Sequence, residues 1–368
     1  MCHRVPPPLL TASLVALVAA LMAAGWFGSA ASSTTPAAAA ASWVAPAFVR
    51  AVQGWLPTSA TDPRPAFNVS NCPFLAEIYD LAPTPDAIPA LANPSFVSAL
   101  EAVWLDEREP VLGLKIGADS HCYPVRIMNY HSLVHDRLGG QAVYVFWDPP
   151  SGVALARRQW SASRPLGLAG LGFRGTGLAY ERAGGALWDL FGGGPLAAPG
   201  KTVTPNLPGD YQWLPLERMT WRAWRRLHGN TQVLSLQTGY AFNYSRDPYT
   251  AALSPQGRPE DYWRSDTILA PPALRVGDEL VPDKAVVLGF LSGAEQWAAP
   301  LDELAAEPGE VTIETAAGEV KVSVRAPDDR YSVTDEQGRW LPQARLFWFA
   351  WKARFPQTKV WHPEPEEE

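Results

Sequence analysis

The sequence predicts a strand-rich α+β protein of two related lobes from an internal duplication, preceded by an N-terminal transmembrane helix. Three observations support this prediction. The run from Leu9 to Gly28 carries no charge, two motifs recur later in the chain, and the composition is poor in charge (18%) but holds 36 Pro and 29 Gly. Frequent turn formers favour short strands over long helices. With 368 residues, 47% of them apolar, the chain can form one or two packed domains.

The uncharged run Leu9–Gly28 has twenty residues, about the length that a helix needs to cross a bilayer. Arg4 precedes it, and Trp26 and Phe27 close it, as expected for a basic cytoplasmic side and an aromatic far interface. Small residues recur at every fourth position, a spacing that lets helices pack closely in lipid: Ala12, Ala16, Ala20, Ala24 and Gly28. A signal peptide cleaved near Gly28-Ser29-Ala30 is the alternative. Either segment places the rest of the chain outside the cytoplasm, on the periplasmic side of a bacterial membrane.

Composition divides the chain into four expected parts. Residues 1–30 are the membrane anchor or an uncleaved signal, and residues 31–67, rich in Ala, Pro, Ser and Thr, are a tether. Residues 68–260 form a first lobe, and residues 261–368 form a shorter second lobe with an acidic tail.

Two blocks repeated in the same order predict the two lobes. Val111-Leu112-Gly113-Leu114 matches Val287-Leu288-Gly289-Phe290 at an offset of 176, and Trp221-Arg222-Ala223-Trp224 matches Trp348-Phe349-Ala350-Trp351 at an offset of 127. Each lobe is therefore expected to contain a strand pair, a short helix, further strands, and a Trp-bearing helix that leads into a strand.

Local patterns predict individual elements within this frame. Apolar spacing favours helices, the second of which Gly139-Gly140 would stop, and alternation around Ala317-Gly318 favours a hairpin. In chain order, the sequence predicts a helix over Pro94–Leu105, a strand over Val111–Ile116, a helix over Arg126–Leu138, a strand over Ala142–Trp147, a helix over Met219–His228, and a hairpin of residues 311–313 and 320–324.

The net charge of −7 argues against nucleic acid as a partner, because nucleic-acid binding requires a basic surface. Cys2 lies before the anchor, on the cytoplasmic side. Cys72 and Cys122 would share an oxidising compartment, so the simplest expectation for them is a structural disulfide.

Several motifs resemble a bacterial family of unknown function, DUF 3179, over roughly residues 85–361. Those in the first half are Ile88-Pro89-Ala90-Leu91, Glu109-Pro110-Val111-Leu112-Gly113, Tyr123-Pro124-Val125-Arg126-Ile127, and His131 with Asp136-Arg137-Leu138-Gly139-Gly140. Those that follow are Leu187-Trp188, Thr220-Trp221 with Trp224, Val233-Leu234-Ser235, Thr238-Gly239 and Asp247-Pro248-Tyr249. The family has no established activity, so the resemblance implies a fold and a compartment but no reaction.

One departure from the family pattern bears on function. Where members usually carry Cys-Pro-Leu-Cys-Gly, this chain has Asp148-Pro149-Pro150-Ser151-Gly152. Thiolates are the nucleophiles and soft-metal ligands that a Cys-x-x-Cys pair supplies. Asp and Ser cannot replace that chemistry, so a redox or metal function of the family would be lost here.

Four residues are candidates for a metal site. His131 and His135 would share a face of the expected helix, a spacing that binds zinc, and His121 and Cys122 could complete the ligand set. The alternative is that His131 is partly buried and hydrogen-bonds the backbone while His135 lies on the surface. Asp136 with Asp247 is a further acid–base candidate, although Asp247-Pro248-Tyr249 also reads as a turn. No catalytic residue or cofactor is assigned.

The 16 Trp residues suggest a core and an interface. The repeated pairs Trp221/Trp224 and Trp348/Trp351 are expected to be core anchors. The interface candidates lie in loop-like contexts: Trp43, Trp55, Trp160, Trp213, Trp263, Trp297 and Trp340.

The sequence favours a membrane-anchored, non-catalytic accessory subunit on the extracytoplasmic side. It would bind integral membrane subunits of a larger complex, of the respiratory or photosynthetic electron-transfer kind. One alternative is a periplasmic metal-binding or redox enzyme using the four metal candidates. The other is a soluble periplasmic ligand-binding protein.

Overall fold

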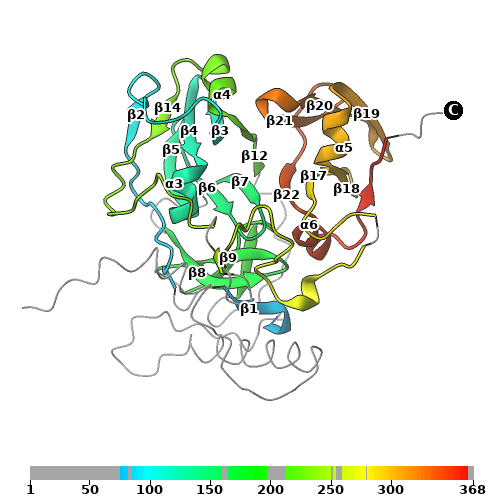
Figure 1. Ribbon diagram of the computed structural model, residues 1–368, viewed down its shortest axis with the longest axis horizontal. Helices are drawn as coiled ribbons and strands as arrows, with labels where there is room; N and C mark the ends of the chain where they lie inside the picture. The colour runs from blue at the N-terminus through cyan, green and yellow to red at the C-terminus, as the bar shows by residue number, and fades with distance from the viewer. Residues whose placement is uncertain are drawn as a thin grey trace, which may run out of the picture.

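The computed structural model describes residues 75–81, 85–159, 165–183, 185–197, 213–249, 252–253, 259–278 and 280–363. These residues form a strand-rich α+β structure with few helices (Figure 1). The expected anchor and tether lie outside them. Among the described residues, no helix has both the length and the apolar character needed to cross a membrane.

Two sheets are built from residues 96–158 and 213–234, and these segments are called the first lobe from here on. The first is ordered β13 (Leu216–Thr220), β3 (Pro110–Ile116), β4 (Asp119–Pro124), β14 (Gln232–Leu234) and β2 (Phe96–Ser98). The second is ordered β12 (Trp213–Leu214), β7 (Val153–Arg158), β6 (Gln141–Asp148) and β5 (Leu133–Leu138). Helix α3 (Val125–His131) connects β4 to β5, and α4 (Trp221–Leu227) connects β13 to β14.

The second lobe has a corresponding set of elements. One sheet is ordered β22 (Gln343–Phe347), β17 (Val286–Ser292), β18 (Glu295–Pro300) and β23 (Lys359–Val360), and the other β19 (Gly309–Thr315), β20 (Gly318–Arg325) and β21 (Arg330–Asp335). The helices are α5 (Leu301–Ala306) and α6 (Trp348–Arg354), and a 3₁₀ turn η4 (Ala326–Asp328) joins β20 to β21. Figure 1 shows this lobe beside the first.

A separate sheet lies below the first lobe in Figure 1. Its order is β1 (Ile78–Asp80), β8 (Leu166–Phe173), β9 (Thr176–Glu181), β10 (Leu187–Asp189) and β11 (Gly194–Ala197). The remaining elements are short: η2 (Leu75–Glu77), β15 (Ala252–Leu253), β16 (Pro259–Glu260) and η3 (Pro272–Leu274).

Strand pairing in the two lobes follows the same register. Val111 pairs with Pro124 in the first lobe, and Val287 pairs with Pro300 in the second. Both residue numbers differ by 176 between the lobes. Val111 also pairs with Met219 of β13, and Val287 pairs with Leu346 of β22. The residue numbers of β13 and β22 therefore differ by 127. In each of these two sheets the fourth strand, β14 or β23, runs parallel to the third, β4 or β18.

The hairpins that follow also correspond, at an offset of 177. Leu138 pairs with Gln141 across the β5–β6 turn, and Thr315 pairs with Gly318 across the β19–β20 turn. The closing pairs of the next turn are Asp148 with Val153 and Arg325 with Arg330. Strand β5 therefore corresponds to β19, β6 to β20, and β7 to β21.

In each lobe a buried Trp ring lies against a glycine of the central strand. A Cβ atom on Gly113 would lie 2.2 Å from the Trp224 ring, and one on Gly289 would lie 2.3 Å from the Trp351 ring. Both Trp residues are fully buried, as expected for core anchors. A side chain larger than hydrogen cannot fit at either glycine, because core atoms are already in contact.

One helix prediction was wrong and a second holds only over its first half, whereas the predicted strands, the hairpin and the helix at Trp221 are confirmed. Over Pro94–Leu105, the chain forms strand β2 and then turns. The backbone N–H and hydroxyl of Ser98 both donate to Glu101 (2.8 and 2.7 Å), but this capping arrangement starts only one turn.

The helix expected over Arg126–Leu138 ends at His131, because Ser132 is left-handed (φ 55°). The chain then forms β5, and Gly139-Gly140, both with positive φ, make the two-residue turn of a hairpin. Gly-Gly between two short apolar runs is itself a hairpin signal, and here it outweighs the helical spacing.

We expect Gly113→Ala to lower the free energy of unfolding by about 2 kcal/mol or more, because the new methyl group overlaps the Trp224 ring. Gly229→Ala is the matched control, since its Cβ would meet nothing closer than 3.9 Å, and it should change stability by less than about 0.5 kcal/mol. Urea denaturation followed by Trp fluorescence measures both. Equal effects would contradict the role of this contact.

Candidate functional site

The turn after β6 occupies the place of the family's Cys pair, and the structure makes it a buried turn. The N–H of Gly152 donates to the carbonyl O of Asp148 (2.8 Å). Gly152 has a φ of 73°, a conformation that glycine adopts without strain. Pro149 and Pro150 between them favour a turn over a continued strand.

The two polar side chains of this turn bond to each other inside the protein. The Ser151 hydroxyl donates to Oδ2 of Asp148 (2.5 Å), and the residues are 0% and 6% exposed. Burial raises the pKa of Asp148 to about 6, although hydrogen bonds from Ser151 and the Gly177 N–H oppose the shift. The carboxyl group is thus held in a medium that disfavours its charge.

Three tyrosines with raised pKa values surround Asp148: Tyr79, Tyr249 and Tyr262. Burial is the largest cause in each case, and the nearby carboxylate adds to it. The Tyr262 hydroxyl donates to the carbonyl O of Pro150 (2.5 Å), which fixes the turn. These tyrosines are therefore neutral at physiological pH.

The turn is also a joint between the lobes. The N–H of Phe347, at the end of β22, donates to the carbonyl O of Ser151 (2.8 Å). In the reverse direction, the second-lobe turn at η4 contacts β13 and α4, where Arg226 donates to Asp328 and Arg330 to Glu217, both at 2.6 Å. Each lobe thus packs its second hairpin turn on the other lobe's Trp-bearing segment.

A shared carboxylate lies at this joint. Arg345 on β22 donates to Asp329 (2.5 Å), and Arg218 on β13 lies 3.9 Å from the other oxygen of that carboxylate. The two arginines correspond at the offset of 127. Burial, and next the charge of Arg345, lower the pKa of Arg218 to about 9, while Asp329 opposes the shift. Asp329 therefore offsets the repulsion of two close cations.

A second ion pair connects α6 to the sheet formed by β1 and β8 to β11. Arg354 lies 2.6 Å from Asp189 on β10, with side chains 9% and 6% exposed. Arg157 donates to the carbonyl O of Phe191 (2.6 Å), and burial lowers the pKa of its guanidinium. The second lobe is thereby fixed to β10 as well as to the β6–β7 turn.

The histidines expected to bind a metal are engaged elsewhere. His131 lies at the end of α3 with Nδ1 2.9 Å from the carbonyl O of Pro89 and Nε2 2.6 Å from the Tyr244 hydroxyl. Since a carbonyl only accepts, Nδ1 carries the proton and Nε2 accepts from Tyr244. Burial lowers the pKa of His131 to about 4, so the ring is neutral.

His135 is buried on β5 and not on the surface, which corrects one expectation. Its Nε2 donates to the carbonyl O of Leu166 (2.9 Å), and burial lowers its pKa. It does not share a helix face with His131, because the helix ends between them.

His121 and Cys122 are neighbours on β4 and differ in surroundings. His121 contacts Asp136 on β5 (2.6 Å), which also accepts from the Tyr123 hydroxyl (2.6 Å). Cys122 is fully buried in the core that holds Trp224, and burial raises the pKa of its thiol. In the described part of the chain, no three or more His, Cys, Asp or Glu residues are placed to hold a metal. The four metal candidates do not converge.

The other candidate residues have separate positions. Cys72 lies outside the described ranges, so its disulfide with Cys122 stays a prediction, as does any role of Trp43, Trp55 and Trp160. Four interface candidates are partly buried: Trp213, Trp263, Trp297 and Trp340. Three of these contact protein groups, with Trp213 under Arg157, Trp263 donating to Asp247, and Trp297 stacked on Phe290.

Asp247 caps its turn as expected, by accepting from the N–H of Tyr249 (2.8 Å), while its proposed acid–base partner Asp136 binds His121 and Tyr123 instead. Sequence reasoning missed Arg218, Arg345 and Asp329. The offset of 127 relates the two arginines, and this signal could have found them.

These features define a strand-rich α+β protein with few helices among the described residues. The family model "Protein of unknown function (DUF3179)" matches residues 85–358, and the chain belongs to this family. No curated protein and no solved structure matches the chain.

The contribution of Asp148 to stability should fall as pH rises through the titration of its carboxyl group. Its pKa is about 6 in the folded protein against an ordinary value of 3.8, so the folded state holds the proton more tightly. Stabilisation is complete below about pH 4 and is lost by about pH 7, with a span of about 3 kcal/mol. Asp148→Asn should remove this dependence and unfold at higher urea than the parent at pH 7.

The control for this comparison is Asp266→Asn, at an exposed position, which should leave the pH profile unchanged. A difference in unfolding free energy between the parent and Asp148→Asn that is the same at pH 4.5 and pH 7 would contradict the assignment.

Asp329→Asn should destabilise the joint by about 2 kcal/mol, because Arg218 and Arg345 lose their shared counter-charge in a partly buried site. Asn keeps the left-handed backbone of this position (φ 53°), so the effect isolates the charge. Asp328→Asn, facing the exposed Arg226, should cost less than about 1 kcal/mol. Thermal unfolding compares the two.

Proposed function

We propose that this protein is a membrane-anchored, extracytoplasmic accessory subunit that binds and stabilises partners in a larger membrane complex. The observation that carries the proposal is the state of the β6–β7 turn. Asp148 and Ser151 bond to each other, are sealed from solvent, and join the lobes. The place of the reactive Cys pair thus has a structural role in this chain.

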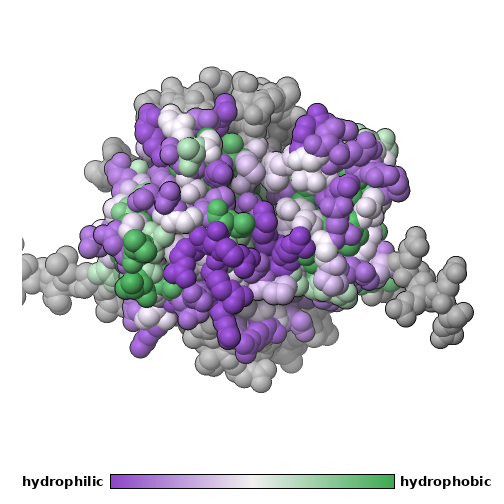
Figure 2. All heavy atoms as spheres, turned by 90° about the horizontal axis from the view of Figure 1, so that it is seen from above, coloured by the Kyte–Doolittle hydropathy of each residue, from purple (hydrophilic) through white to green (hydrophobic). Residues whose placement is uncertain are grey.

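Surface features support a binding role. Leu100 and Val103, in the turn after β2, are 89% and 88% exposed, and Leu280 is 77% exposed. Figure 2 shows one face that is largely hydrophilic, with apolar residues gathered in a few small groups. Exposed apolar residues that occur together mark interaction sites more often than single ones do.

The alternative of a metal or redox enzyme has less support. It would need His121, Cys122, His131 and His135 to meet at one ion, whereas the histidines bond to separate protein groups. A soluble ligand-binding protein released by cleavage remains the other alternative, and the state of the N-terminus separates it from our proposal.

We also propose that the lobes arose by duplication of one unit. Matching registers at offsets of 176, 177 and 127 and the paired Gly–Trp contacts support this origin. The reciprocal joint resembles the isologous interface of a two-fold dimer.

Native mass spectrometry of the protein extracted from its own membranes in mild detergent tests the main proposal. We expect the chain to retain its N-terminal segment and to migrate with other membrane subunits. An electron-transfer partner would add visible absorbance to the assembly. A processed, monomeric species would overturn the proposal, and a stoichiometric metal lost in His131→Ala would favour the enzyme alternative.

A further inference from the structure

Strand β19 has an open edge. Thr315 and Gly318 flank the two-residue turn and form a hydrogen-bonded pair, so odd-numbered β19 residues face β20 and even-numbered ones face outward. The outward groups belong to Glu310, Thr312 and Glu314, whose side chains are all exposed. Among the described residues, no backbone partner is present for these groups. In Figure 1, β19 lies on the side of the second lobe away from the first.

The corresponding edge of the first lobe is covered. Leu91 forms a parallel bridge with Val134 of β5. The N–H of Leu91 donates to the carbonyl O of Leu133 (2.9 Å), and the N–H of His135 donates to the carbonyl O of Leu91 (2.8 Å). At the offset of 177, these two β5 groups correspond to the carbonyl O of Glu310 and the N–H of Thr312. The outer edge of β5 thus pairs with a parallel segment in the first lobe, whereas the corresponding edge of β19 pairs with no segment among the described residues.

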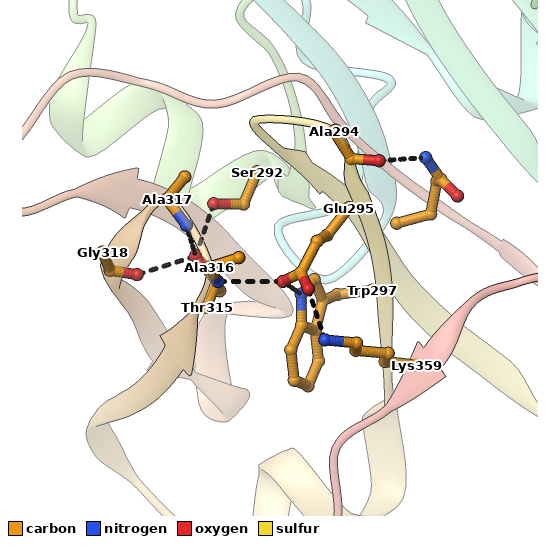
Figure 3. A network of polar contacts seen from close by, with 10 residues as sticks. Ser292, Ala294, Glu295, Trp297, Thr315, Ala316, Ala317, Gly318 and Lys359 are labelled. Atoms are coloured by element: carbon orange, nitrogen blue, oxygen red, sulfur yellow. Dashed lines mark hydrogen bonds and ion pairs between the residues drawn. The ribbon is translucent and has the colours of Figure 1, made fainter.

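The open edge is held rigidly at its end (Figure 3). The N–H of Ala316 donates to Glu295 (3.0 Å), which also accepts from Trp297 and Lys359. Thr315 bonds to Ser292 (2.8 Å). A strand edge fixed in this way needs little ordering when a segment binds, and lower ordering cost favours affinity.

Charge defines the segment that fits. Glu314 lies directly opposite Glu319, a like-charge pair that destabilises a sheet, and Glu336 reaches the N–H of Glu319 (3.1 Å). Lys321 pairs with Glu310 (3.1 Å). The exposed face therefore has more carboxylates than cations, whereas Val311 and Ile313 point to the core side.

We propose that β19 binds an extended basic segment of a partner protein as an additional parallel strand. Residues opposite Val311 and Ile313 would be apolar, as Leu91 is in the first lobe, and the alternate residues would be Lys or Arg facing Glu310 and Glu314. This inference rests on the proposed binding function and identifies the surface at which a partner would bind. Strand addition of this kind takes affinity from the backbone and specificity from alternate side chains.

Other occupants are disfavoured by charge. A second copy paired edge to edge would oppose Glu310 and Glu314 with the same residues. The chain's own C-terminal residues, Glu364, Glu366, Glu367 and Glu368, are acidic as well. Like charges on paired strands repel.

The test is binding of a labelled peptide, acetyl-Lys-Val-Lys-Val-Lys-Val-amide, to the full chain by fluorescence anisotropy. We expect saturable binding, and no binding of the Glu-Val counterpart. Thr312→Pro removes the outward N–H, a change that an edge strand tolerates, and should weaken binding at least tenfold. Thr312→Val keeps the N–H and is the matched control, expected to bind as the parent does.

If Thr312→Pro unfolds, the charge reversals Glu310→Lys and Glu314→Lys replace it, with the same tenfold loss expected. No binding by the parent, or equal binding by parent and Thr312→Pro, would overturn the inference. The native complex separates this from the broader proposal. A complex that persists in folded Thr312→Pro places the partner on another surface, whereas a monomeric parent refutes the accessory role itself.

Discussion

The contact between a glycine and a tryptophan ring controls the packing of each lobe. Trp224 lies over Gly113 and Trp351 over Gly289, so each helix approaches its sheet more closely than a side chain would permit. Backbone bonds set this approach: the N–H of Trp221 donates to the carbonyl O of Glu109, and that of Trp348 to Ala285. The helix start, the central strand and the ring therefore form one unit.

This unit orients the strand that precedes it, and that strand makes the joint. Strand β13 carries Arg218 three residues before Trp221, and β22 carries Arg345 three residues before Trp348. Both arginines reach Asp329 because each β-strand is fixed by its own Trp contact. The joint differs between its two halves, since one turn is a buried Asp–Ser pair and the other is a charged η4 turn. Corresponding turns of the two lobes thus carry different side chains.

The sequence was sufficient for features that depend on local or repeated signals. The repeated blocks indicated the strand pairs and the Trp-bearing helices, and alternation predicted the β19–β20 hairpin. The sequence misled where two local signals competed. Ser98 with Glu101 resembles the start of a helix, and Gly139-Gly140 is compatible with either a helix stop or a hairpin turn. Tertiary pairing decides such cases, and one sequence does not contain that information.

The candidate site was less predictable because its contacts join distant segments. Asp148 could be singled out by the departure from the family motif, but its burial depends on Tyr79, Tyr249 and Tyr262, which are far apart in the chain. The alternative reading of His131, a hydrogen bond to the backbone, is found at Pro89. Its bond to Tyr244 spans 113 residues, and no spacing rule reaches that far.

The positions at which the lobes differ separate two kinds of chemistry. In the first lobe, His121 contacts Asp136; the corresponding residues of the second lobe are Trp297, at an offset of 176, and Ile313, at 177, and both join an apolar cluster. Conversely, the first lobe covers the β5 edge with its own Leu91, whereas the second leaves β19 uncovered within the described residues. The polar pair of the first lobe is thus replaced by apolar packing in the second, and the backbone groups that Leu91 pairs in the first lobe have no backbone partner among the described residues of the second. A surface that binds another chain must remain unused by its own fold, and the β19 edge meets this condition among the described residues.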